Sequence, residues 1–207
     1  MRKWLILFFI TVAFNANAQI SSKTNKEQNS PKGFQKDRLF TGGNVIVAFS
    51  NRYTVLGLSP QFGYSLTNWL DAGISFNFNY TSQRDYSTYG DKLRETVYGP
   101  GAFVRIFPVN FLFGTAQFEY NTIRQKYISA TSGTPDQIDW VSAPSLLVGG
   151  GYSGGRENGG NSYYYISVMW DVAGDVNSPY TDGYNRSNPI IRAGYNIGLF
   201  QGKKKRY

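Results

Sequence analysis

The most regular stretch of the chain runs from Leu70 to Tyr80, where apolar and polar residues alternate without a break. Side chains of a β-strand point alternately to its two faces, so this pattern predicts a strand with one apolar and one polar face. A tilted strand needs roughly 9–11 residues to cross a bilayer, whereas strands of soluble proteins usually have about 5–6. The length of this segment therefore favours a membrane-spanning strand.

Seven further segments alternate in the same way, although less regularly. They span residues 39–50, 54–65, 97–107, 111–125, 143–152, 163–171 and 189–200. Pro60 weakens the second of them because proline removes one hydrogen bond from the ladder. Together the eight segments predict an all-β fold, an eight-stranded antiparallel up-and-down transmembrane β-barrel.

The connections between these segments fall into two classes that alternate along the chain. Residues 67–68, 108–110 and the glycine-rich 153–161 are expected to form inner turns. Residues 51–52 would form a tight outer turn, and three long polar loops are expected at 83–96, 126–142 and 172–188. Short inner turns and longer outer loops are typical of outer-membrane barrels.

Alternation alone does not say which face points inward, so a soluble lipocalin-like barrel with an apolar cavity is the competing interpretation. The polar positions carry mostly Ser, Asn, Thr, Gln and Gly, where a water-exposed face would carry many Lys and Glu. Small polar residues suit the narrow interior of an eight-stranded barrel. The sequence therefore favours an apolar face toward lipid and a filled, polar lumen.

A few charged residues fall on the predicted inward face, and an unpaired charge buried there would be very costly. We expect them to pair across the lumen as a structural ion-pair network, in preference to a catalytic or gating role. The candidate site residues are Asp71, Arg105, Glu119, Asp171 and Arg192.

The two ends of the chain differ from the alternating body. Residues 1–18 combine a basic start, a short apolar run and an Ala16-x-Ala18 end, which predicts a secretory signal peptide cleaved after Ala18. An N-terminal membrane anchor is the alternative, but the apolar run falls short of the roughly 20 residues of a spanning helix. Residues 19–38 are predicted to be a flexible periplasmic leader, residues 39–200 the barrel, and residues 201–207 a basic tail.

The net charge of +8 would suggest a nucleic-acid partner if it were spread over the body of the protein. The basic excess lies instead in the leader and the tail, and residues 39–200 carry ten basic against eleven acidic side chains. No nucleic-acid partner is expected.

The chain contains no histidine and no cysteine. Ser–His–Asp and Cys–His catalysis are therefore impossible, and any metal site would have to consist of oxygen ligands. No cofactor motif is present, because the run Gly149–Gly155 lacks the Lys-Ser/Thr and the helix of a phosphate loop. We expect no enzymatic activity, no cofactor and no metal.

Two sequence features carry a resemblance to a known family. Residues Arg192-Ala193-Gly194-Tyr195-Asn196-Ile197-Gly198-Leu199 resemble the signal that bacterial outer-membrane proteins present to the barrel-assembly machinery, and Gly42-Gly43-Asn44 with Ser59-Pro60-Gln61-Phe62-Gly63-Tyr64 resembles small barrels of Bacteroidetes-type bacteria. From about Leu39 to Phe200 the chain looks like the OmpA/OmpX-like outer-membrane barrels. The tail departs from that pattern, since many such proteins end at a terminal aromatic that Phe200 would represent.

The resemblance implies a location in the outer membrane of a Gram-negative cell, with lipid and the assembly machinery as partners. We expect a structural or surface-interaction role through long extracellular loops that contact an external ligand or surface. A narrow transport or small-ligand-binding barrel and a soluble lipocalin-like carrier are the alternatives.

Overall fold

The computed structural model describes residues 33–49, 51–131, 133–156, 160–182, 184 and 186–201. The predicted signal peptide, most of the predicted leader and residues 202–207 of the predicted tail lie outside this part of the chain. The last three residues of the predicted leader form a short 3-10 turn, η1 (Lys36–Arg38), where Arg38 donates a 3.0 Å hydrogen bond to the carbonyl of Leu66.

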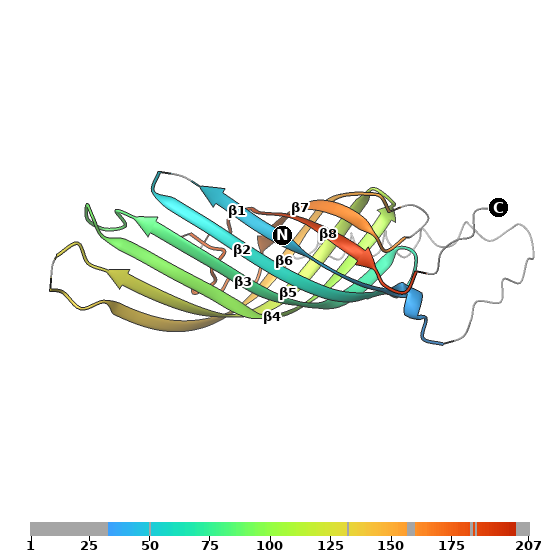
Figure 1. The fold of residues 1–207 in the computed structure, drawn as a ribbon, viewed down its shortest axis with the longest axis horizontal. Coiled ribbons are helices and arrows are strands. Elements are labelled where there is room, and N and C mark those ends of the chain that lie inside the picture. The colour runs from blue at the N-terminus through green and yellow to red at the C-terminus, as the bar shows by residue number, and fades with distance from the viewer. Residues whose placement is uncertain are drawn as a thin grey trace, which may run out of the picture. The chain divides into compact units, whose positions relative to one another are not determined.

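The described residues form eight strands that close into one antiparallel barrel in chain order (Figure 1). Hydrogen bonds between the first and last strands close it, with Phe40 opposite Gly198. This confirms the predicted eight-stranded up-and-down barrel. The strands are β1 (Leu39–Phe49), β2 (Tyr53–Ser65), β3 (Leu70–Arg84), β4 (Lys92–Val109), β5 (Leu112–Ile128), β6 (Gln137–Gly154), β7 (Tyr163–Asp171) and β8 (Ile190–Gly198).

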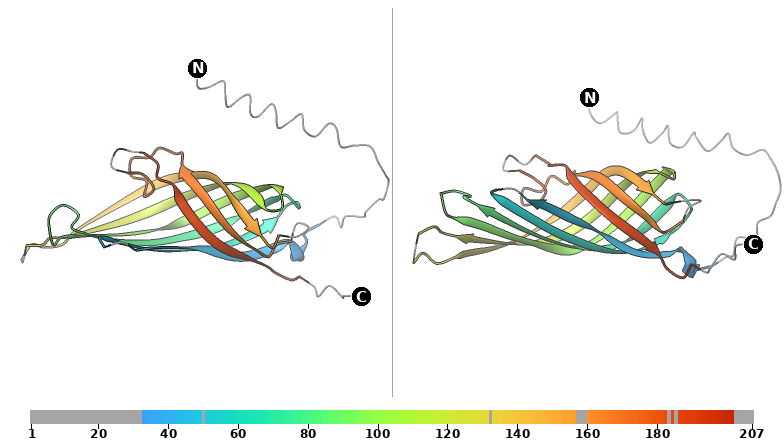
Figure 2. Two further views of the ribbon diagram at one scale, coloured as in Figure 1. Left: turned by 90° about the horizontal axis from the view of Figure 1, so that it is seen from above. Right: turned by 45° about the horizontal axis from the view of Figure 1, so that its top comes forward.

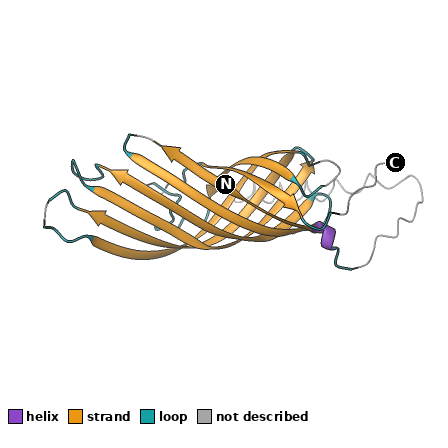
Figure 3. Cartoon of the chain, in the orientation of Figure 1, coloured by secondary structure: helices purple, strands orange, loops and turns teal. Residues whose placement is uncertain are grey.

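The barrel has two different ends (Figures 1 and 2). We call the end that carries η1 and the β2–β3, β4–β5 and β6–β7 connections the turn end. The opposite end, with the β1–β2, β3–β4, β5–β6 and β7–β8 connections, is the loop end. There the β3–β4 and β5–β6 hairpins reach further out than the β1–β2 hairpin, at the left of Figure 3.

Two of the three predicted long loops are wrong in extent. β3 continues to Arg84 and β4 begins at Lys92, so that connection comprises residues 85–91 instead of 83–96. The next is residues 129–136 instead of 126–142. Beyond the apolar segments polar residues occur on both faces of these strands, beside scattered apolar ones such as Leu93, Ile123 and Trp140. The alternation signal is therefore lost while backbone pairing continues, because ladder hydrogen bonds do not depend on side-chain polarity. Only the β7–β8 connection is a long loop among the described connections.

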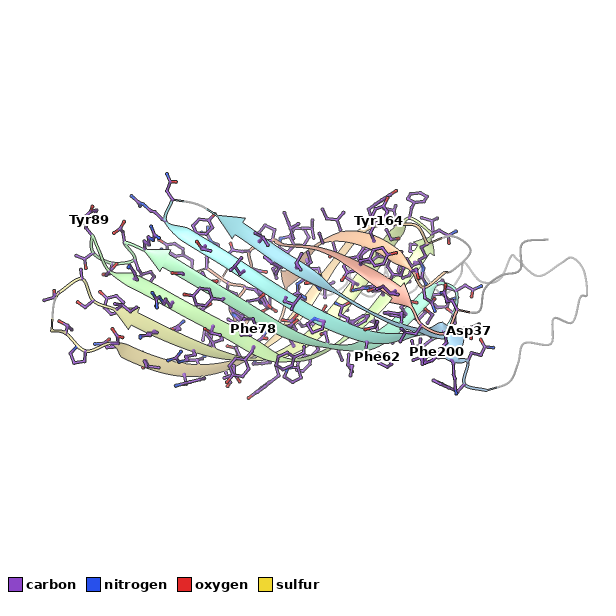
Figure 4. All side chains as sticks on the ribbon, viewed as in Figure 1. Asp37, Phe62, Phe78, Tyr89, Tyr164 and Phe200 are labelled. Carbon is purple, nitrogen blue, oxygen red and sulfur yellow. The ribbon has the colours of Figure 1, made fainter. Side chains whose placement is uncertain are left out.

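The alternation of the sequence becomes an inside and an outside in the barrel. Along β3 the odd-numbered residues from Asp71 to Asn79 face the lumen, and the even-numbered apolar residues face outward. Ile74 is 64% exposed and Phe78 lies on the outer wall (Figure 4). An apolar exterior with a polar interior is the reverse of a lipocalin-like carrier, which the structure therefore does not support.

Inward-facing glycines allow neighbouring strands and lumen side chains to approach closely. A Cβ at Gly63 would enter the ring of Phe40, which fills this part of the lumen with no exposed surface. A Cβ at Gly99 would collide with the carbonyl oxygen of Tyr120 on β5. The glycine content of the sequence thus reflects the tight interior of a small barrel. In the described part of the chain, no helix is long and apolar enough to cross a membrane.

Candidate functional site

A buried ion pair lies in the lumen at the turn end. Arg156, in the connection after β6, places its two terminal nitrogens 2.9 and 3.0 Å from the carboxylate oxygens of Asp71 on β3. Both side chains have no exposed surface. Ser65 donates a 2.7 Å hydrogen bond to the same carboxylate, and the hydroxyl of Tyr163 donates another to it at 3.1 Å. Every charge in this group is therefore neutralised by direct hydrogen-bonded partners.

Arg105 stands next to this ion pair and is held mainly by aromatic rings. The strand register places it opposite Asp71, but it donates instead to Gln61 at 2.7 Å and to the Tyr163 hydroxyl at 3.3 Å. Its guanidinium carbon lies 4.7 Å from the ring centre of Phe103 and 4.4 Å from that of Tyr165. Cations at such distances are attracted to the negative face of an aromatic ring.

A second buried ion pair occupies the lumen nearer the loop end. Arg192 on β8 donates to Glu119 on β5 at 2.9 Å, and neither side chain is more than 1% exposed. Tyr180, from the β7–β8 loop, donates its hydroxyl to the other oxygen of Glu119 at 2.6 Å. Gln117 and Asn121 donate to this carboxylate at 2.9 and 3.2 Å. This loop is thus attached to the interior through a charged partner.

The fifth candidate residue, Asp171 at the end of β7, makes no ion pair in the described structure. It accepts a 2.5 Å hydrogen bond from the hydroxyl of Ser178, and 3.0 Å bonds from the backbone N–H groups of Leu146 and Ala173. Ser178 also lies 3.1 Å from the hydroxyl of Ser145. Asp171 therefore acts as a cap that fixes the start of the β7–β8 loop.

The five candidate residues are all buried in the lumen, but they do not form one network. Glu119 and Arg192 pair directly, whereas the partner of Asp71 is Arg156, which sequence reasoning missed. Arg156 was overlooked because it lies in a glycine-rich turn, where alternation gives no facing; Tyr180 was missed because its long loop has no period. Arg156 is a single arginine in a turn at the end of a small lumen that contains acidic residues, and this is the signal that could have suggested its pairing with Asp71.

Large side chains fill the lumen at the turn end. Phe107, Phe113, Tyr163 and Tyr165 form one buried cluster, with edge-to-face contacts at ring distances of 5.6 and 6.1 Å. Arg156 stacks on Phe107 at 3.8 Å from the ring centre. These rings and guanidinium groups obstruct the passage at this end.

Polar side chains occupy the middle of the lumen on the β1–β3 side. Asn44, Ser59 and Asn77 are at most 2% exposed, and each has a side-chain oxygen without a hydrogen-bond partner among the described protein atoms. Buried groups of this kind normally bond to internal water. The middle of the lumen is therefore polar but narrow.

The loop end carries a cavity between the protruding hairpins and the β7–β8 loop. It has a volume of about 340 Å³ and is lined by both apolar and polar residues, among them Leu93, Ile123, Val176 and Glu95. Burial raises the pKa of Glu95, an effect partly offset by a 3.0 Å hydrogen bond from Gln125. The cavity therefore offers both apolar and polar contacts at this end of the barrel.

The outer wall bears an apolar belt with aromatic residues at both margins. Toward the loop end Tyr80, Tyr98 and Tyr120 face outward where the continuous outward apolar runs of β3, β4 and β5 meet polar positions. Toward the turn end the aromatic residues Trp69, Phe111, Tyr152 and Tyr164 are exposed. Figure 4 shows Tyr164 and Phe62 on the outer wall toward this margin. Belts of this kind, with an aromatic residue at each margin, are characteristic of membrane barrels.

The described residues contain no group of three or more acidic side chains that could hold a metal ion. The chemistry available in the lumen is ion pairing, hydrogen bonding and ring stacking. These arrangements position side chains and fill space, and the sequence lacks histidine and cysteine, which supply the general base or the thiol nucleophile in many hydrolases.

Comparison with known proteins gives distant structural likenesses only. No protein-family model and no curated protein matches the sequence. The attachment invasion locus protein Ail of Yersinia pestis, in complex with the heparin analogue sucrose octasulfate, is similar with a TM-score of 0.45 and 10% identity, over 77% of this chain and 94% of that chain. Neisserial surface protein A is similar with a TM-score of 0.41 and 13% identity, over 78% of this chain and 94% of that chain. Ail in a phospholipid bilayer nanodisc is similar with a TM-score of 0.38 and 14% identity, over 77% of this chain and 97% of that chain. Function must therefore be argued from this chain's own residues.

Proposed function

We propose that the protein is a non-enzymatic barrel of the Gram-negative outer membrane, with a sealed lumen and a surface-contact role at its loop end. The observation that carries the proposal is the apolar belt on the outer wall, bounded by aromatic residues at both margins. In water this surface would be a large exposed apolar patch, which soluble monomers avoid. In a bilayer it faces lipid at no such cost.

The height of the belt fits a membrane. From Leu70 to Tyr80 the strand advances about 33 Å at roughly 3.3 Å per residue. A tilt of about 40° reduces this to about 25 Å along the barrel axis, the height of the apolar band in outer-membrane barrels. The resemblance of Arg192–Leu199 to the assembly signal supports delivery by the barrel-assembly machinery after signal-peptide removal near Ala18.

The loop end supplies the surface for contact with an external partner. Tyr89, at the tip of the β3–β4 hairpin (Figure 4), is 91% exposed. Tyr86 and Tyr184 are also exposed. Exposed tyrosines give large contact area at low cost in side-chain entropy and are enriched in binding surfaces. The partner's contacts would be made by the protruding β3–β4 hairpin and the β7–β8 loop, which carry these tyrosines.

Insertion into lipid vesicles tests the proposal. The mature chain, unfolded in urea and diluted into phospholipid vesicles, should fold into a species that migrates faster on electrophoresis when not boiled. Trypsin should leave a protected barrel fragment in the vesicle pellet. A processed chain that stays in the soluble fraction and binds no vesicles would contradict the membrane assignment and favour a secreted carrier.

A narrow pore or ligand-binding barrel is the second candidate. The cavity at the loop end favours ligand binding, whereas the side chains that obstruct the turn end oppose a pore. Planar-bilayer recordings of the inserted protein should therefore show no steady conductance above leak. Steady, reproducible channel openings would show that the lumen is open and overturn the sealed barrel.

A further inference from the structure

A one-sided arrangement of charge marks the part of the barrel that protrudes beyond the tyrosine margin. On β3–β5 the basic residues Arg84, Lys92, Arg94, Arg124 and Lys126 all occupy outward positions. The acidic residue of these extensions, Glu95, and Asp139 on β6 occupy inward positions instead. Among the described strand positions here, the outward face carries cations and no carboxylate. We call the five basic residues the basic face.

The basic face repels itself within the isolated protein. The strand register places Arg84 directly opposite Lys92, and Arg94 directly opposite Lys126. Like charges directly opposite each other on neighbouring strands destabilise a sheet. Lys126 is paired with Asp136 at 2.7 Å, but Arg84, Lys92 and Arg94 have no ion pair among the described residues. An external anion would relieve this repulsion.

Three arginines of the face share one position relative to the apolar belt. Arg84 follows Tyr80 by four residues, Arg124 follows Tyr120 by four, and Arg94 precedes Tyr98 by four. Four residues of tilted strand raise each arginine about 10 Å above its tyrosine. The polar region of a bilayer extends roughly 5–8 Å beyond the hydrocarbon on each side, and long arginine side chains reach down into it.

We propose that the basic face binds the phosphate groups of anionic glycolipid in the outer leaflet. This rests on the proposed membrane location, because it uses the tyrosine margin as the level of the interface. Guanidinium groups bind phosphate through two parallel hydrogen bonds, and three arginines on adjacent strands would meet the phosphates of lipid packed against the barrel. The outward direction selects lipid beside the barrel as the occupant.

The test compares two full-length variants that lose the same charge. R84Q/R94Q/R124Q removes three cations from the basic face, and K203Q/K204Q/K205Q removes three from the tail. Each is refolded in neutral detergent, checked for the electrophoretic shift of the folded barrel, and titrated with diphosphoryl lipid A by thermophoresis. Dephosphorylated lipid A and inorganic pyrophosphate serve as further probes. The single variant R94Q provides a milder change.

The half-saturating concentration of diphosphoryl lipid A should rise about tenfold or more for R84Q/R94Q/R124Q, and less for R94Q. The tail variant should bind as the wild type does, and dephosphorylated lipid A should bind the wild type weakly. Equal binding by the wild type and the face variant would overturn the proposal, and so would equal loss in the tail variant. Displacement by equimolar pyrophosphate would assign the face to soluble anions. Because every sample is first shown to fold as a barrel, these failures remain distinct from failure of the membrane assignment.

Discussion

Arg156 and Asp71 form an ion pair with two hydrogen bonds, 2.9 and 3.0 Å long, in which both side chains are completely buried. The pair joins the connection after β6 to the start of β3, where Asp71 is the second residue of the strand. Arg156 also donates to the carbonyl oxygens of Asn68 and Gly160 at 3.3 Å. One guanidinium therefore ties two inner turns together and closes the turn end.

Replacing Asp71 by Asn should destabilise the barrel strongly. The change leaves the Arg156 charge buried without its counter-charge, which typically costs about 3–5 kcal/mol of unfolding free energy. Equilibrium unfolding in urea, in detergent or vesicles, measures the loss. Asp136→Asn is the matched control, because it breaks a partly exposed pair with Lys126 and should cost less than about 1 kcal/mol.

The double variant D71N/R156M separates pairing from packing. If the cost of D71N comes from an uncompensated charge, removing that charge as well should recover part of the lost stability. A double variant less stable than D71N by the full cost of a second independent change would show that the two residues act separately.

Tyr180→Phe should loosen the β7–β8 loop without unfolding the barrel. The lost hydroxyl donates to Glu119 at 2.6 Å, and hydrogen bonds to charged groups contribute about 1.5–3 kcal/mol. If cleavage follows loop opening, trypsin should cut after Arg186 about tenfold faster or more. Tyr89→Phe, whose hydroxyl lies on an exposed tip, should leave the rate unchanged. Equal rates in wild type and Tyr180→Phe would mean that this hydrogen bond does not hold the loop.

Gly99→Ala should impair folding, whereas Gly114→Ala should not. A Cβ at Gly99 collides with the backbone carbonyl of Tyr120, which cannot move without shifting β5. Overpacking of this kind costs about 1–3 kcal/mol or more. A Cβ at Gly114 meets nothing closer than a carbonyl oxygen at 4.0 Å. The folded yield in vesicles and the urea midpoint compare the two, and equal midpoints would count against the predicted close approach.

The barrel could be predicted from the sequence because its interior and exterior differ in polarity at every second residue. β7 has the predicted bounds, Tyr163–Asp171, and β3 begins where alternation begins, at Leu70. Alternation ends at Tyr80, where the outside changes from lipid-like to polar, and the strand continues to Arg84 without any change in its hydrogen bonding. The sequence pattern therefore records the environment of a strand more faithfully than its ends.

The lumen was predicted only in part, for the same reason. Residues within strands have a predictable facing, so Glu119 and Arg192 could be placed in the lumen together. Arg156 and Tyr180 come from connections, and their inward direction depends on the path of turns that have no period. The basic face was also missed. Lys92 and Arg94 lie on one face of β4 and Glu95 on the other, but this pattern is too short to recognise without the register of the neighbouring strands.

The β3–β4 turn is organised around the carboxylate of Asp91. It accepts hydrogen bonds from the backbone N–H groups of Tyr86, Ser87 and Thr88 at 2.6, 3.0 and 2.8 Å, and from the Tyr127 hydroxyl at 2.9 Å. Burial acts to raise the pKa of Asp91, but these hydrogen bonds outweigh it and hold the pKa below its ordinary value. The turn therefore depends on the charged form of one side chain.

This dependence predicts a hairpin tip that loosens only in acid. A carboxyl group whose pKa is lower in the folded turn contributes its full stabilisation above the unfolded pKa of about 3.9, and loses it as pH falls through the lower folded value. Hydrogen exchange of the amides of residues 86–88, corrected for intrinsic rates, should therefore show constant protection from pH 7 to 5 and a loss below about pH 4. Asp91→Asn should give weaker protection that no longer changes with pH, while the β5–β6 turn serves as an internal reference. Loss of protection between pH 7 and 5 in the wild type would contradict the lowered pKa. It would mean that the Asp91 carboxyl group becomes protonated in that range, whereas these hydrogen bonds favour its ionised form.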